Sequence, residues 1–110
     1  MKNRIIVEAS FRRPAKRLAK RYPSFPFDLL ELIVELETDA HLGVSLGGRL
    51  RKIRMSVASK GKGKSGGARV IAYVLVEIGR VHLLTVYDKA DRESISDEEL
   101  KVLMKRIGSL

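Results

Sequence analysis

A chain of 110 residues is the size of one domain, and such a domain buries roughly two-thirds of its unfolded surface. With 45% hydrophobic residues and no run of about 20 apolar ones, it is neither a disordered polar tract nor a membrane protein. The absence of cysteine excludes a disulfide framework and a zinc–thiolate site, and with 2 histidines we expect no metal centre and no cofactor. No charged and apolar leader opens the chain, so we expect a cytoplasmic protein.

The formal net charge of +9 is unevenly distributed along the chain. Residues 1–24 carry eight basic side chains and one acidic one, whereas residues 28–42 carry five acidic and no basic ones. Residues 49–69 carry eight basic side chains and no acidic one. Such an oriented field predicts a polyanionic partner, and solubility through self-repulsion is the alternative explanation.

The first part of the chain predicts one strand and two helices. Residues 4–9 are β-branched and apolar, which favours a strand. Apolar side chains recur at helical spacing over 11–21, and Ser10 is positioned to cap that helix. A second helix is predicted over 25–37, with Ser24 as its cap.

The remainder predicts three strands and one helix, with glycine-rich connections. Alternating apolar and basic residues indicate a strand with one wet face, and a β-branched apolar run indicates a central strand. A serine followed three residues later by a glutamate forms a capping box before the last helix. The predicted segments are a connecting loop at 39–48, a strand at 52–57, an irregular segment at 59–67, a central strand at 68–76, a strand at 81–87 and a helix beginning at Ser96.

This order, β-α-α-β-β-β-α, predicts a single α+β domain over residues 1–110. The last three strands are joined by short connections, so they should form an antiparallel meander. Two N-terminal helices and one C-terminal helix would pack against this curved antiparallel sheet.

Chain connectivity predicts that basic residues far apart in the sequence meet at one rim of the sheet. The segment 59–67 joins two antiparallel strands, so it lies where the third strand begins and the fourth ends. Arg69 stands at that beginning and Tyr87 at that end. A hairpin register that the sequence leaves open decides which faces these two side chains occupy. The side chains expected to converge are Lys60, Lys62, Lys64, Arg69, Tyr87 and Lys89.

The glycines of this segment match parts of two nucleotide-binding patterns, G-x-G-x-x-G and the end of a Walker A loop. Both patterns need a helix to follow, and a strand is predicted instead, so we expect no nucleotide site. Glycines interleaved with lysines fit the backbone of a nucleic acid better, and a solvated loop without a ligand is the alternative.

The residue types at the rim suit metal-free cleavage of RNA by its own 2′-hydroxyl. That reaction needs a proton acceptor, cations around the phosphate and a proton donor. Arg69 is suited to clamp a phosphate, and Tyr87 to stack on a base or exchange a proton, although a tyrosine at a strand end also packs against the core. His82 lies at the opposite end of its strand and is interpreted as structural, and His41 as a solvated loop residue.

Three segments and the start of the last helix together resemble the RelE/HigB toxins of bacterial toxin–antitoxin modules. They are Leu50-Arg51-Lys52-Ile53-Arg54, the run from Ser59 to Ile71, Leu83-Leu84-Thr85-Val86-Tyr87-Asp88-Lys89, and Ile95-Ser96-Asp97-Glu98-Glu99-Leu100. The specific part of the resemblance covers residues 50–105, whereas the two N-terminal helices agree in order and charge only.

The resemblance implies a small RNase fold that cleaves messenger RNA in the ribosomal A site, touches ribosomal RNA and is inhibited by a cognate antitoxin. We expect the antitoxin to be a helix-turn-helix protein, and the toxin to be monomeric alone and oligomeric with it. The implied catalytic residues are Arg69, Tyr87, Lys89 and Lys62, and the implied RNA-binding residues are Lys60, Lys64, Arg54, Lys52 and Arg51.

Two alternatives remain open at this stage. One is a ParE-like inhibitor of gyrase without nuclease activity, and the other is a basic nucleic-acid-binding module that catalyses nothing. The clustered lysines with Arg69 and Tyr87 favour RNA cleavage.

Overall fold

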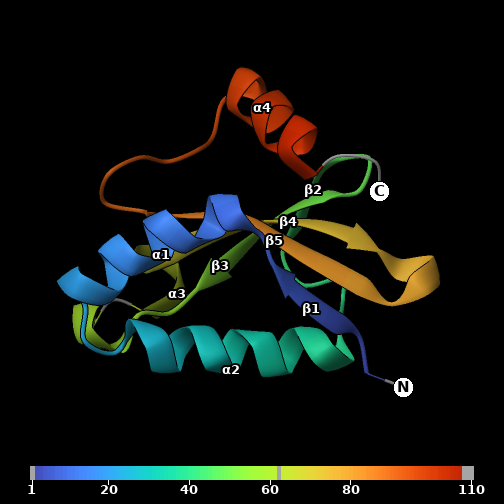
Figure 1. Ribbon diagram of the computed structural model, residues 1–110. Helices are drawn as coiled ribbons and strands as arrows, with labels where there is room; N and C mark the ends of the chain where they lie inside the picture. The colour runs from blue at the N-terminus through green and yellow to red at the C-terminus, as the bar shows by residue number, and fades with distance from the viewer. Residues whose placement is uncertain (1, 62, 108–110) are drawn as a thin grey trace.

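A five-stranded sheet runs through the centre of the computed structural model, which describes residues 2–61 and 63–107 (Figure 1). The α+β class is confirmed, as is the order of the predicted elements. In the described residues the strands are β1 (Arg4–Val7), β2 (Val44–Gly47), β3 (Leu50–Met55), β4 (Ala68–Leu75) and β5 (Arg80–Asp88). The helices are α1 (Ala9–Arg21), α2 (Phe25–Thr38), the single turn α3 (Gly63–Gly66) and α4 (Asp97–Ile107), with 3-10 turns at Ala58–Lys60 and Val76–Ile78.

The strand order β1-β5-β4-β3-β2 contains the predicted meander, because β3, β4 and β5 pair antiparallel. β1 forms the far edge and runs parallel to β5, with Ile5 opposite Val81. β2 lies within the segment 39–48, for which the prediction of a connecting loop was wrong. β2 is only four residues long and lies among Gly43, Gly47 and Gly48, which is why the sequence favoured a loop.

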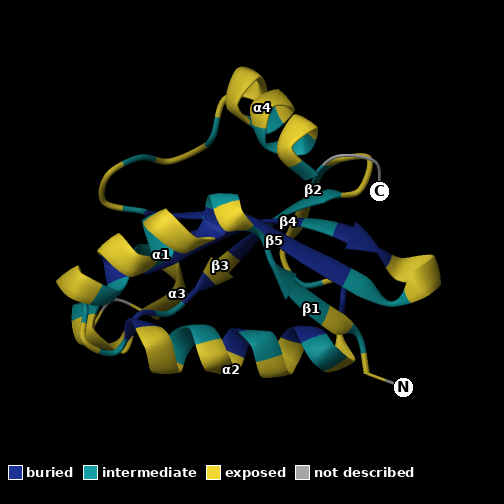
Figure 2. Cartoon of the chain, in the orientation of Figure 1, coloured by how far each residue is buried: buried dark blue, intermediate teal, exposed yellow. Residues whose placement is uncertain are grey.

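Alternation along the strands separates two cores on the two faces of the sheet. Val70 of β4 faces one side, where it packs with Phe11 of α1 and Leu36 of α2. Ile71 and Leu84 face the other side, where the apolar residues of α4 cover them. Figure 2 shows the strands as the buried layer between α4 above and α2 below. In the part of the chain that the structure describes, no helix has the length and apolarity needed to cross a bilayer.

One of the three predicted helix caps has the expected geometry. The backbone N–H of Glu99 donates to the hydroxyl of Ser96 at 3.2 Å, as in an N-terminal cap. α1 begins one residue before Ser10, whose hydroxyl donates to a backbone carbonyl of β5 at 2.5 Å instead. Ser24 stands at the N-terminus of α2, but its hydroxyl donates to the carboxylate of Asp28 at 2.7 Å.

The glycine-rich segment 59–67 is more regular than predicted, since it contains the end of a 3-10 turn and the turn α3. It is attached to the connection between α1 and α2, where the N–H of Ser59 donates to the hydroxyl of Ser24 at 2.8 Å. Gly67 closes the segment in close contact with β3. A Cβ atom there would lie 2.0 Å from the carbonyl oxygen of Met55, so only glycine fits at this crossing.

Candidate functional site

Three neighbouring strands bring Arg54, Arg69 and Tyr87 into one row at the end of the sheet. Arg69 on β4 lies directly opposite Arg54 on β3 and directly opposite Tyr87 on β5. Residues directly opposite one another share a face, and Tyr87 belongs to the core that α4 covers. The register that the sequence left open therefore places all three side chains on the α4 side of the sheet, at the rim formed by segment 59–67.

Arg69 is the central residue of this row, and it is buried, with only 3% of its surface exposed. It donates to the backbone carbonyls of Lys64 at 3.0 Å, Ser65 at 2.9 Å and Ala68 at 3.1 Å. Burial, together with the charge of Arg54, lowers the pKa of Arg69, but an arginine remains charged. Its N–H groups thus hold the turn α3 in place, whereas the sequence analysis expected them to face a phosphate.

Tyr87 is buried beneath a second arginine that the sequence analysis did not identify. The guanidinium of Arg92 lies 4.7 Å from the centre of the Tyr87 ring, a cation–π contact. Arg92 also donates to both carboxylate oxygens of Glu99 on α4, at 2.7 and 3.0 Å. Burial raises the pKa of Tyr87 despite the nearby arginines, so its phenol is protonated at neutral pH and can donate a proton.

Lys89 and Glu93 extend the rim beyond the end of β5. The backbone N–H of Lys89 donates to the carbonyl of Gly67 at 3.1 Å, which ties this end to the glycine-rich segment. The ammonium of Lys89 lies 2.7 Å from the exposed carboxylate of Glu93. This hydrogen bond and the charge of Lys89, with a smaller effect of Arg69, lower the pKa of Glu93. Arg92 and Glu93 follow Lys89 within a few residues, but no motif in the sequence marks them as part of the site.

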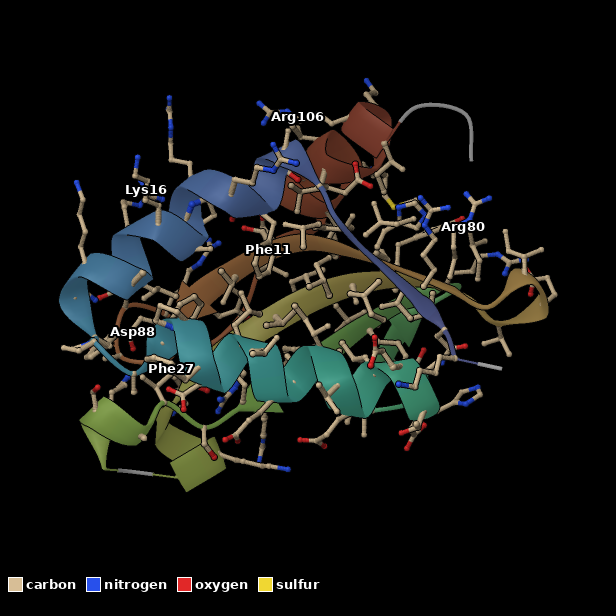
Figure 3. All side chains as sticks on the ribbon, turned by 60° about the horizontal axis from the view of Figure 1, so that its bottom comes forward. Phe11, Lys16, Phe27, Arg80, Asp88 and Arg106 are labelled. Carbon is tan, nitrogen blue, oxygen red and sulfur yellow. The ribbon has the colours of Figure 1, made fainter. Side chains whose placement is uncertain are left out.

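Lys60 lies in a buried ion pair. Its ammonium binds the carboxylate of Asp88, and its side chain is only 7% exposed. The phenol of Tyr22 donates to the same carboxylate at 2.5 Å, and Arg21 donates to it at 2.9 Å. Burial opposes the ionisation of Asp88, but the donors led by Lys60 outweigh burial and lower the pKa of Asp88. Figure 3 shows Asp88 at the end of the molecule where α1 turns into α2.

In the structure Lys60 therefore directs its charge to Asp88, whereas an RNA-binding role was predicted for it. Arg51, also predicted to bind RNA, lies on the opposite face of β3 from the row and donates to three backbone carbonyls of residues 41–43 at 2.8–3.0 Å. Lys52 shares the face of the row, and Lys64 is exposed on α3. Lys62 lies outside the described residues.

Neither histidine lies at the rim. His82 is 3% exposed near the opposite end of β5 from Tyr87, and its Nδ1 lies 2.7 Å from the carboxylate of Glu8. His41 is exposed in the loop before β2. Among residues 2–61 and 63–107, no three or more histidine, aspartate or glutamate side chains are grouped so that they could hold a metal ion.

A cleft of about 790 Å³ opens between α1 and α4 next to Tyr87. α1 contributes Arg13 and Arg17 to its lining at fourth-residue spacing, and α4 contributes Arg106. Figure 3 shows Arg106 near α1, and Lys16 pointing from α1 into solvent. The positive surface at the rim therefore continues along α1.

The sequence matches the family described as the RelE toxin of the RelE/RelB toxin–antitoxin system over residues 3–109. The chain belongs to the RelE toxin family. The fold of this RelE-family toxin is similar to the solved structure of a mutant Escherichia coli toxin RelE in the free state. The TM-score is 0.57 at 17% identity, over 97% of this chain and 99% of that chain. Family membership makes the protein the toxin of a toxin–antitoxin system, with an antitoxin as its partner.

Proposed function

We propose that this RelE-family toxin is an endoribonuclease that cleaves messenger RNA in the ribosomal A site, without a metal ion. The observation that carries the proposal is the row Arg54–Arg69–Tyr87 across three strands, with Lys64 and Lys89 at the same rim. The proposal includes contacts with ribosomal RNA, a cytoplasmic location and a toxin that is monomeric alone. It also includes a helix-turn-helix antitoxin, with which the toxin forms an oligomer.

In the proposed reaction the 2′-oxygen of the RNA attacks the adjacent phosphorus, and the bond from phosphorus to the 5′-oxygen of the next nucleotide breaks. The products are a 2′,3′-cyclic phosphate and a 5′-hydroxyl. One proton leaves the 2′-hydroxyl and one is delivered to the departing 5′-oxygen, so the reaction needs no oxidant or other reactant. Negative charge develops on the phosphate oxygens, and nearby cations stabilise it.

The exposed cations of the rim are suited to hold that phosphate. Arg54 is exposed next to Arg69 and offers a planar fork of donors that binds two oxygens at once. Lys64 is exposed and its backbone is held by Arg69, which gives the buried arginine a positioning role as well as a positive charge below the site. Lys52, on the same face, extends the cationic track along β3.

Two kinds of group at the rim are suited to the proton transfers. Glu93 is ionised and exposed, so we assign it the acceptance of the 2′-hydroxyl proton. Tyr87 and Lys89 are the donors that contact Glu93, since the Tyr87 hydroxyl lies 3.5 Å from its backbone carbonyl and the Lys89 ammonium lies 2.7 Å from its carboxylate. Glu93→Gln should therefore lower the cleavage rate about 100-fold and remove the acidic limb of its pH profile, measured by single-turnover cleavage.

Primer extension on a message under translation, with analysis of the chemical ends of the fragments, tests the proposal. The toxin should produce cuts in translated codons, and the upstream fragments should end in a 2′,3′-cyclic phosphate. Arg54→Gln should lower cleavage about 100-fold. The matched control Arg4→Gln removes an exposed arginine from β1 at the far end of the molecule, and it should cleave like the wild type.

The outcomes separate the three candidate functions. No cuts, together with inhibition of DNA supercoiling by gyrase, would replace the nuclease with a ParE-like inhibitor. Binding of RNA without either effect would leave a non-catalytic module. Upstream fragments that end in a 3′-hydroxyl would contradict attack by the 2′-hydroxyl, and equal loss in Arg54→Gln and Arg4→Gln would contradict the assignment of the row.

A further inference from the structure

The outer face of α2 is apolar although nothing in the described chain covers it. Phe27 is 71% exposed, Leu30 59% and Val34 55%. These residues are three and four apart, so they form one continuous stripe on the helix surface. The inner face of the same helix is already buried through Leu32 and Leu36. Figure 2 shows the exposed outer side of α2, and Figure 3 labels Phe27 near the N-terminal end of the helix.

Scattered exposed apolar residues are normal, but a contiguous stripe marks an interaction surface. Seven large apolar side chains are strongly exposed among the described residues, and three of them form this stripe. A solvent-facing helix side would ordinarily be polar. The stripe therefore indicates that α2 packs against another molecule as well as against its own sheet.

Acidic side chains border the stripe. Glu31 and Glu35 are exposed on one side of it, and the segment 28–42 contains no lysine or arginine. Asp28 lies near the start of the helix, where its carboxylate accepts hydrogen bonds from Ser24 and from the backbone of the segment after β3. The outer face of α2 is thus an apolar patch with an acidic border, on a chain whose net charge is +9.

This charge decides between possible occupants. A nucleic acid would be repelled by the carboxylates. Two copies of the chain that paired along α2 would bring the borders of both helices together, and like charges across an interface are unfavourable. An apolar segment bordered by lysine or arginine satisfies both the stripe and its border.

A groove of about 280 Å³ runs alongside this patch between α2 and β3. Glu31 and Glu35 line it from α2, and the exposed Val44 of β2 lines it from the sheet edge. Arg54 and Lys64 belong to the same lining. A partner seated on α2 would therefore lie directly beside the cations of the candidate site.

We propose that the outer face of α2 is a docking site for the antitoxin, through an amphipathic segment with apolar side chains at helical spacing and a basic border. The proposal rests on membership of the toxin–antitoxin family and not on the nuclease activity. Docking at this face places the antitoxin next to Arg54 and Lys64, so it obstructs the rim from the side of α2.

The test measures the dissociation constant of the toxin for the antitoxin encoded with it, after co-expression, separation and refolding of the purified toxin. Val34→Ser should weaken binding about tenfold, and Leu30→Ser/Val34→Ser about 100-fold. The matched control is Val102→Ser on α4, where the same side chain is 51% exposed compared with 55% at Val34. It should bind within about twofold of the wild type.

Charge reversal gives a second readout that a merely destabilised helix would not produce. Glu31→Lys/Glu35→Lys should weaken binding at low salt by about tenfold and reduce its dependence on salt concentration. Circular dichroism of each variant establishes that it is folded. Because binding is measured directly, a failure of this test is separate from a failure of the cleavage assay.

Several results would overturn the proposal. Loss of binding in Val102→Ser with none in Val34→Ser would place the antitoxin on α4. Stronger binding after charge reversal would mean that the docking segment is acidic. A toxin that is a dimer without its antitoxin and becomes monomeric in Val34→Ser would assign the face to a second copy of the chain.

Discussion

Replacing Asp88 by asparagine should lower the free energy of unfolding by about 3–5 kcal/mol. The carboxylate is 1% exposed and binds the ammonium of Lys60, whose side chain is 7% exposed. Asparagine has nearly the same shape but no charge, so the ammonium would remain buried without a counter-ion. Breaking a buried pair in this way costs more than the pair contributes, because the remaining charge has lost its hydration.

The reciprocal substitution should be milder. Lys60→Met keeps most of the apolar stem and removes the charge, while Tyr22 and Arg21 still donate to Asp88. We expect a loss of about 1.5–3 kcal/mol, the scale of one hydrogen bond to a charged group. In the Asp88→Asn background, Lys60→Met should instead raise stability, because it removes the uncompensated ammonium.

Urea unfolding followed by circular dichroism at pH 7 measures these effects, and the midpoint of thermal unfolding should fall by roughly 12–20 °C in Asp88→Asn. The control Glu77→Gln breaks the exposed ion pair with Arg49 and should change stability by less than about 0.5 kcal/mol. A loss below about 1 kcal/mol in Asp88→Asn would refute the reasoning. So would a double variant that is less stable than Asp88→Asn alone, since Lys60 would then stabilise the fold in some way other than by pairing.

Three further predictions concern the rim and its supports. Gly67→Ala should destabilise the protein by about 2–4 kcal/mol in urea, because the added Cβ meets the Met55 carbonyl at 2.0 Å, and a variant of normal stability would contradict that contact. The pKa of Asp88 is lowered in the folded protein, so its stabilising contribution is complete above the unfolded pKa of about 3.9 and is lost as the pH falls toward the folded pKa. Acid unfolding should therefore be less steep in Asp88→Asn than in the wild type. An unchanged dependence of stability on pH would contradict this. Tyr87→Phe should lower cleavage about 100-fold in single-turnover assays, whereas Tyr73→Phe, elsewhere on the face that α4 covers, should not, and equal activities would remove the phenol from the reaction.

The parts of the fold that the sequence predicts well are those with strong local signals. The alternation of Ile53 and Met55 with basic residues located β3, and the continuous apolar run of β4 follows from its burial on both faces. β2 escaped prediction because its alternating residues Val44-Ser45-Leu46 are few and are enclosed by Gly43, Gly47 and Gly48. The parallel pairing of β1 with β5 has no local signal either, since Arg4 pairs with Arg80 from a distant part of the chain.

In the candidate site, too, some features follow from the sequence and others form only on folding. Connectivity alone placed Arg69 and Tyr87 at one rim, because the ends of antiparallel strands are fixed by the connections between them. The environment of each cation was not predictable in this way. Lys60 forms an ion pair with Asp88, and Arg51 donates hydrogen bonds to carbonyls of the loop before β2. These acceptors lie near the two cations only after the chain has folded.

The parallel pairing of β1 with β5 also determines when the sheet can be completed during translation. The first strand to be made has as its hydrogen-bonding neighbour the last one, so the edge of the sheet stays open until most of the chain has been translated. The row of Arg54, Arg69 and Tyr87 likewise needs β5. A nascent chain is therefore unable to assemble this row before Tyr87 of β5 has been made.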